Sequence, residues 1–135
     1  MVRRKQGALY NFRLTAEDRA AIIAAAETLT LEGRHVANIH VVAQLLRILA
    51  ADMESNPVTA QERLELPEVN SKDPQVGGVI PTDLVEQIPR LVKIAGVPGA
   101  NSLVMLARRR YLPWIPDHRD GGGVVNIERL LEFAQ

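Results

Sequence analysis

The sequence predicts a mainly α-helical protein with two short β-strands, organised as two successive units that each run strand, helix, helix. Residues 8–14 have the pattern of a short strand. In an extended segment, Tyr10, Phe12 and Leu14 would share one face and Leu9, Asn11 and Arg13 the other, because successive strand side chains point to opposite faces. Apolar side chains recur at helical spacing in four other segments. The order of strand and helix signals in the first half of the chain recurs in residues 75–112.

The composition is that of an ordinary globular protein. The 135 residues are 47% apolar and 24% charged, which suits one compact domain. The absence of cysteine excludes disulfide bonds, thiolate metal ligands and a cysteine nucleophile. The sequence has no apolar run of the roughly 18 residues of a membrane span, and the basic start is followed by charged residues rather than a signal-peptide core. We therefore expect a cytoplasmic protein with no membrane contact.

The net charge of zero results from alternating basic and acidic segments. Residues 1–51 carry a net charge of +3 and residues 52–73 carry −4. The contrast recurs, with +3 in residues 74–112 and −2 in residues 113–135. This pattern predicts two basic units that are separated by an acidic linker.

The predicted domain organisation follows these charge segments. A first unit with a basic N-terminal arm covers residues 1–53, and a second unit covers residues 75–113. Between them, residues 54–74 are rich in Pro, Glu, Asn and Ser and are expected to form a linker or a loosely packed arm. Residues 114–135 are the expected C-terminal tail.

Each unit contains two predicted helices. In the first unit, Thr15 is expected to cap a helix at residues 16–29, where alanines favour helix formation. Asn38 is the expected N-cap of a second helix at residues 38–53, which has a continuous apolar stripe.

The second unit begins with a weak strand at residues 75–80, and Pro81 opens the helix that follows. Pro89 lies inside this helix and lacks a backbone donor, so we expect a bend or a restart there. Asn101 is the expected N-cap of the next helix, which ends before Pro113.

The tail is expected to contain a flexible turn at the three glycines 121–123, followed by a short capped helix. Four side chains in this last segment are too apolar to lie free in water: Ile127, Leu130, Leu131 and Phe133. We expect them to pack on the main core or on a partner protein.

Residues 10–17 (YNFRLTAE) resemble the strand of the ribbon-helix-helix family, the MetJ/Arc type of repressor. Residues 80–88 and 101–112 are similar to the strand exit and the second helix of the same family. The resemblance implies a two-stranded antiparallel β-ribbon that lies in the major groove of double-stranded DNA, with four helices beneath it. Single-chain tandem forms of this fold are associated with plasmid conjugation and T-DNA transfer. We therefore expect a DNA-transfer accessory protein or a transcriptional repressor.

A tandem ribbon-helix-helix chain can form its ribbon in two ways. Pairing of residues 8–14 with residues 75–81 gives a monomeric tandem unit, and a linker of about 20 residues has ample reach for it. Pairing of equivalent strands from two chains gives a homodimer. The sequence leaves both arrangements open.

The resemblance assigns DNA contacts to particular positions. The expected base contacts are outward strand residues: Leu9, Asn11, Arg13, Gln75 and Val79. The expected phosphate contacts are basic residues and residues at the starts of the second helices: Arg3, Arg4, Lys5, Arg34, Asn38, Asn101 and Ser102. Asn and Gln match adenine and Arg matches guanine, whereas Gly77 supplies no base contact. We expect the first strand to specify sequence and the second mainly to position the protein.

Other functions are not excluded by the sequence. Asn11 and Arg13 are also compatible with the solvated face of an amphipathic edge strand. An antitoxin that binds its operator through the ribbon and masks a toxin with a C-terminal segment is an alternative. A scaffold that binds protein and not DNA is another, favoured by the neutral charge and the glycines of the second strand.

No enzyme activity, cofactor or metal site is expected. The three histidines are too scattered for a metal site, and no nucleophile motif is present. The neighbouring acids Glu17 and Asp18 are explained by the dipole of the helix that they open. Arginines 108–110 are expected to form a solvated face near a helix C-terminus.

Overall fold

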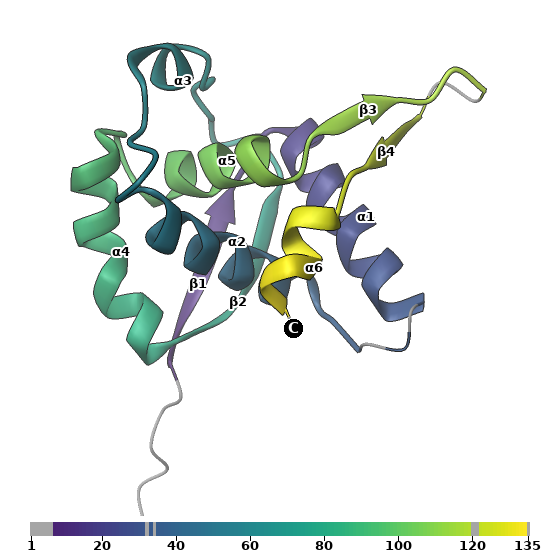
Figure 1. The fold of residues 1–135 in the computed structure, drawn as a ribbon, viewed down its shortest axis with the longest axis horizontal. Coiled ribbons are helices and arrows are strands. Elements are labelled where there is room, and N and C mark those ends of the chain that lie inside the picture. Colours follow the sequence, from purple (N-terminus) through teal and green to yellow (C-terminus); the bar gives the residue numbers. More distant parts are fainter. Residues whose placement is uncertain (1–6, 32, 34, 120–121, 135) are drawn as a thin grey trace, which may run out of the picture.

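The computed structural model describes residues 7–31, 33, 35–119 and 122–134 (Figure 1). The first half contains strand β1 and three helices, namely β1 (Gly7–Arg13), α1 (Ala16–Leu31), α2 (Asn38–Asp52) and α3 (Ala60–Leu64). The remaining elements are β2 (Gln75–Pro81), α4 (Thr82–Ala95), α5 (Ala100–Tyr111), β3 (Trp114–Pro116), β4 (Gly123–Val125) and α6 (Glu128–Ala134). The described chain is mainly α-helical with two small antiparallel sheets, as the sequence predicts at this coarse level.

The two strands β1 and β2 pair with each other within the chain and form an antiparallel ribbon. The register runs from Gly7 opposite Pro81 to Arg13 opposite Gln75. Figure 1 shows the two strands side by side, with α2, α4 and α5 around them. Of the two pairings that the sequence leaves open, the structure contains the one within a single chain.

The two faces of the ribbon differ in burial, because strand side chains alternate. Phe12, Val76 and Ile80 are buried on the face that packs against the helices. Leu9 and Val79 remain exposed on the opposite face. The predicted alternation along the first strand is therefore confirmed.

Gly78 allows the start of α2 to approach the inner face of β2. Its φ angle is 154°, a backbone conformation that residues with a Cβ rarely adopt. A Cβ built on Gly78 would lie 2.7 Å from the Cβ of Ile39, which is the second residue of α2. A glycine is therefore required where the helix meets the ribbon.

Thr15 caps α1 as predicted, because the Asp18 amide donates to Thr15 Oγ1 at 3.2 Å. The predicted caps of the second helices are wrong by one or two residues. Asn38 is the first residue of α2, whose N-cap is Ala37, and Asn101 lies inside α5, whose N-cap is Gly99. The side-chain oxygen of Asn101 has a different partner, the ribbon itself.

The expected restart of α4 at Pro89 does not occur. The helix is continuous from Thr82 to Ala95 and ends at Gly96 in the left-handed conformation, with a φ angle of 71°. Pro89 lies on the exposed side of the helix, where water can satisfy the carbonyl that loses its intrahelical donor.

Three elements, namely α3, β3 and β4, were not predicted from the sequence. The acidic segment contains α3, which Thr59 caps by accepting a hydrogen bond from the Glu62 amide at 3.1 Å. Strands β3 and β4 form a second hairpin that extends beyond the helices in Figure 1. Of the predicted glycine turn at residues 121–123, Gly121 lies outside the described residues, and Gly123 begins β4.

The last helix, α6, packs against α2. Leu130 is buried in the common core, and Ile127 and Leu131 pack against the core. The side chain of Phe133 lies outside the described part. Among the helices that the structure describes, none is long and apolar enough to cross a membrane.

Candidate functional site

The exposed face of the β1–β2 ribbon, which we call the outer face, is the candidate site. It is formed by three cross-strand pairs, namely Leu9 with Val79, Asn11 with Gly77 and Arg13 with Gln75. All five predicted base-contacting residues belong to these pairs. Sequence alternation therefore located the residues of the outer face, and the register shows which of them lie opposite one another.

Asn11 lies over Gly77 on the outer face. A Cβ built on Gly77 would be 2.3 Å from Asn11 Oδ1, so the side-chain amide occupies the space that the glycine leaves empty. Asn11 is exposed, as is Gln75 on the other strand. Both amides are therefore accessible to a ligand that approaches this face.

Arg13 is bound to the turn that leads into β2. Its Nη1 donates to the carbonyl of Ser71 at 2.8 Å and to the carbonyl of Asp73 at 2.6 Å. Close to it, Arg19 Nε donates to the carbonyl of Gln75 at 3.0 Å. These bonds hold the turn and the beginning of β2 against β1 and α1.

The start of α5 lies against β1, and the start of α2 lies against β2. At α5, Asn101 Oδ1 accepts a hydrogen bond from the backbone amide of Arg13 at 3.0 Å, which fixes the helix start to β1. At α2, Ile39 packs against β2 at Gly78. The first amides of a helix have no intrahelical acceptor, and the helix dipole makes such an end favourable for an anion.

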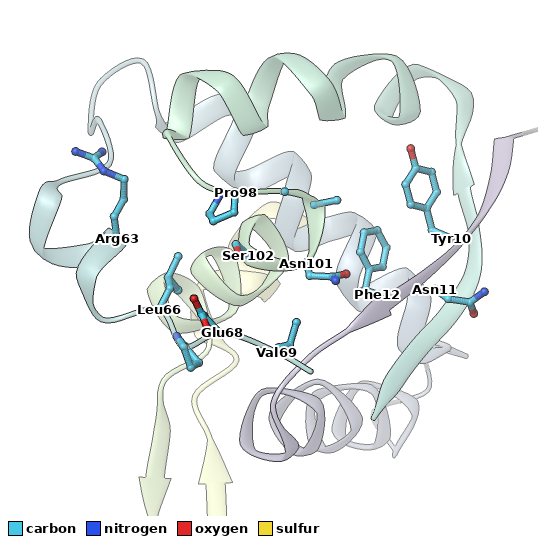
Figure 2. Close-up of a pocket in the computed structure, with 13 residues that line it drawn as sticks. Tyr10, Asn11, Phe12, Arg63, Leu66, Glu68, Val69, Pro98, Asn101 and Ser102 are labelled. Carbon is cyan, nitrogen blue, oxygen red and sulfur yellow. The ribbon is translucent and has the colours of Figure 1, made fainter. Parts of the chain in front are cut away.

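A cleft of about 580 Å³ lies between β1, the start of α5 and the segment after α3. Tyr10 and Phe12 line it with their rings stacked at a centroid distance of 5.2 Å. Figure 2 shows Arg63 across the cleft from them, and Asn11 directed away from Asn101. Arg63 Nη1 donates to the carbonyls of Val58 and Ala95, so this cation supports the wall of the cleft.

The arginine run in α5 is not a solvated helix face, which corrects the sequence prediction. Arg108 is 2% exposed and Asp18 is completely buried. Arg108 Nε donates to Asp18 Oδ1 at 2.6 Å, and Arg109 Nη2 donates to Asp18 Oδ2 at 3.1 Å. Glu17 accepts from Arg108 Nη2 at 3.1 Å. The acids that open α1 therefore join this helix to α5, in addition to any interaction with the helix dipole.

Arg110 and Tyr111 form a second network with the acidic residues of α2 and α3. Tyr111 donates to Asp52 Oδ2 at 2.5 Å, and Arg110 bonds to both Asp52 and Glu62. The hydrogen bond from Tyr111 holds the pKa of Asp52 below its usual value of 3.8. The hydrogen bond from Arg110 holds the pKa of Glu62 below 4.5. Burial and the bond to Asp52 raise the pKa of Tyr111.

This network predicts a loss of stability in acid. A carboxylate whose pKa is lowered by folding stabilises the protein above its unfolded pKa, and this contribution is lost as the pH falls through the folded pKa. For Asp52, the contribution is therefore complete above about pH 3.8 and decreases below it. Replacing Tyr111 by phenylalanine removes the main cause of the shift. We expect the stability difference between wild type and Tyr111→Phe to narrow as the pH falls from 5 to 2.5.

Urea unfolding of both proteins across this pH range measures the difference. Asn70→Ala is a suitable control because Asn70 lies on an exposed turn and does not contact Asp52. Parallel pH profiles for wild type and Tyr111→Phe would contradict the assignment.

The structure brings together most of the residues that the sequence singled out. The predicted base-contacting residues lie on the outer face, while Asn101 and Ser102 lie in the first turn of α5 and Asn38 begins α2. The predicted phosphate contacts Arg3, Arg4, Lys5 and Arg34 lie outside the described residues. The ion pairs of Arg108, Arg109 and Arg110 were not predicted from the sequence. Arg108 is four residues after the buried Val104 and three before the buried Tyr111, so helical spacing alone places it on the buried side of α5.

Comparisons of the chain with protein-family models, with curated proteins and with solved structures give no match.

Proposed function

We propose that the protein is a tandem ribbon-helix-helix protein that binds double-stranded DNA sequence-specifically through the outer face of its ribbon. The observation that carries the proposal is the exposed pair of amides, Asn11 and Gln75, on a ribbon with a helix start packed against each strand. An exposed two-stranded ribbon fits the major groove, which is about 12 Å wide. The proposed cellular role is that of a DNA-transfer accessory protein or a transcriptional repressor.

The amides supply the base contacts in this proposal. Asn and Gln side chains each offer a donor and an acceptor that match the N6 and N7 atoms of adenine. Asn11 is held above Gly77, so its amide is presented without a competing side chain from the opposite strand. A purely solvated strand face has no need for this arrangement.

The helix starts supply phosphate contacts. Backbone amides at a helix N-terminus donate to phosphate oxygens, and the dipole favours the negative charge. The hydrogen bond from Arg13 to Asn101 fixes the start of α5 relative to the ribbon. Contacts to the bases and contacts to the DNA phosphates are thereby coupled, because one rigid unit presents both the side-chain amides of the ribbon and the backbone amides of the helix start.

A charge change at one helix start tests the phosphate contact. We expect Ser102→Asp to weaken DNA binding, because a carboxylate in the first turn of α5 repels phosphate while its interaction with the helix dipole favours folding. The matched control is Ala60→Asp, which places the same charge at an exposed position in the first turn of α3, where the helix dipole also favours it. The duplex is selected from a random library with the full wild-type chain, and affinity is measured by fluorescence anisotropy at several salt concentrations.

Wild-type affinity should fall as salt rises, and Ser102→Asp should lower both the affinity and the steepness of the salt dependence, by about one unit of slope per lost contact. The control should bind with nearly wild-type affinity. Failure to enrich any duplex, or wild-type binding that does not depend on salt, would contradict the proposed function.

A further inference from the structure

The outer face of the ribbon carries a pair of exposed apolar side chains beside its amides. Leu9 is 72% exposed and Val79 is 52% exposed, and they lie directly opposite each other in the ribbon. Contact between the two does not bury them, so their outward surfaces remain in water. A ligand that covers this apolar surface removes it from water, which makes a favourable contribution to the free energy of binding.

The guanidinium that could recognise guanine on this face has another role. Arg13 Nη1 is bound to the carbonyls of Ser71 and Asp73, at 2.8 and 2.6 Å. Bidentate contact with guanine requires two donors of the guanidinium to face the O6 and N7 atoms of the base. Both hydrogens of Nη1 are used in these bonds, so end-on contact through Nη1 and Nη2 would replace bonds that hold the turn before β2. We therefore assign Arg13 a positioning role.

The remaining side chains of the outer face all match one kind of base pair. Asn11 and Gln75 match the N6 and N7 atoms of adenine, and apolar side chains match the methyl group of thymine. Gly77 contributes no side chain. Along the ribbon, the apolar pair comes first, Asn11 follows, and Gln75 lies at the far end.

We propose that the ribbon recognises A·T base pairs in the major groove, with Leu9 and Val79 against thymine methyl groups and the two amides against adenine. This inference rests on the proposed function, namely DNA binding by the outer face. It adds the chemical identity of the target, a site whose central base pairs are A·T and whose thymine methyl groups contribute to affinity.

Replacing thymine by deoxyuridine in the selected duplex tests the inference, because it removes the 5-methyl group and leaves every base-pairing and hydrogen-bonding group unchanged. The wild-type chain should bind the deoxyuridine duplex about fourfold more weakly for each methyl group that it contacts, the value expected for one buried methyl group. The variant Leu9→Ala, Val79→Ala should bind the two duplexes nearly equally. Since both side chains are exposed, the variant should fold normally.

The matched control is Leu64→Ala, which truncates an exposed leucine on α3 and should keep the full preference for thymine. Equal binding of the thymine and deoxyuridine duplexes by wild type would overturn the inference. So would a selected site without A·T pairs, or a thymine preference that survives in the double variant. These outcomes leave DNA binding itself intact, whereas failure to enrich any duplex would overturn the proposed function and the inference with it.

Discussion

Replacing Asp18 by alanine is expected to lower the free energy of unfolding by about 3–5 kcal/mol, the range for breaking a buried ion pair. Asp18 is completely buried and accepts from Arg108, Arg109 and the hydroxyl of Thr15. Its loss leaves the guanidinium of Arg108 buried, with Glu17 as its remaining carboxylate partner. The buried charge then has only the exposed carboxylate of Glu17 to compensate it, and this is the cause of the large effect.

The change is measured by urea unfolding at pH 7. Asp83→Ala is the matched control, because Asp83 forms an exposed ion pair with Arg47 and exposed pairs contribute little. A decrease for Asp18→Ala that does not exceed that of Asp83→Ala would show that the network between α1 and α5 is not a main source of stability.

The double variant Asn11→Ala, Gln75→Ala is expected to lose most of the preference for the selected duplex over a scrambled one. Each amide that contacts adenine contributes about 1–3 kcal/mol of discrimination, so each loss should lower specific affinity by about 5- to 150-fold. Binding to scrambled DNA should change little, because it depends on phosphate contacts. Both side chains are exposed, and the fold should therefore be retained.

Two further variants sharpen this prediction. Gly77→Ala places a methyl group where Asn11 Oδ1 lies and should displace the amide, so it should reproduce the effect of Asn11→Ala. Gln61→Ala removes an exposed amide from α3 and should leave the preference unchanged. Direct base contact by the amides would be refuted if the double variant kept the wild-type ratio of specific to non-specific affinity.

The first strand of the ribbon could be predicted from the sequence because its signals are local, whereas the sequence left open which strand pairs with it. Alternation in the first strand and the switch to a helix at Thr15 depend on neighbouring residues, and the structure reproduces both. The contribution of Gly77 could not be predicted in this way. It depends on register with Asn11, a residue that is distant in sequence and adjacent in space.

The ion pairs of the arginines in α5 could not be predicted for the same reason, since their partners are distant in sequence. Three consecutive arginines near a helix C-terminus have a sufficient local explanation, and their partners in α1, α2 and α3 become apparent when the helices are packed. Asn101 likewise has a local explanation as a cap, yet its oxygen accepts from Arg13 in β1. The second hairpin was missed because its strands have three residues each, too few for a recognisable alternation.

Amide NMR spectra of the ¹⁵N-labelled full chain, recorded during titration with the selected duplex, test the central claim most directly. If the outer face binds DNA, the largest shift changes will occur at Leu9, Asn11, Gln75 and Val79 and at the starts of α2 and α5. The hairpin of β3 and β4 and the helix α3 will change little. Shift changes confined to that hairpin or to α3, with unchanged amides in β1 and β2, would contradict the claim.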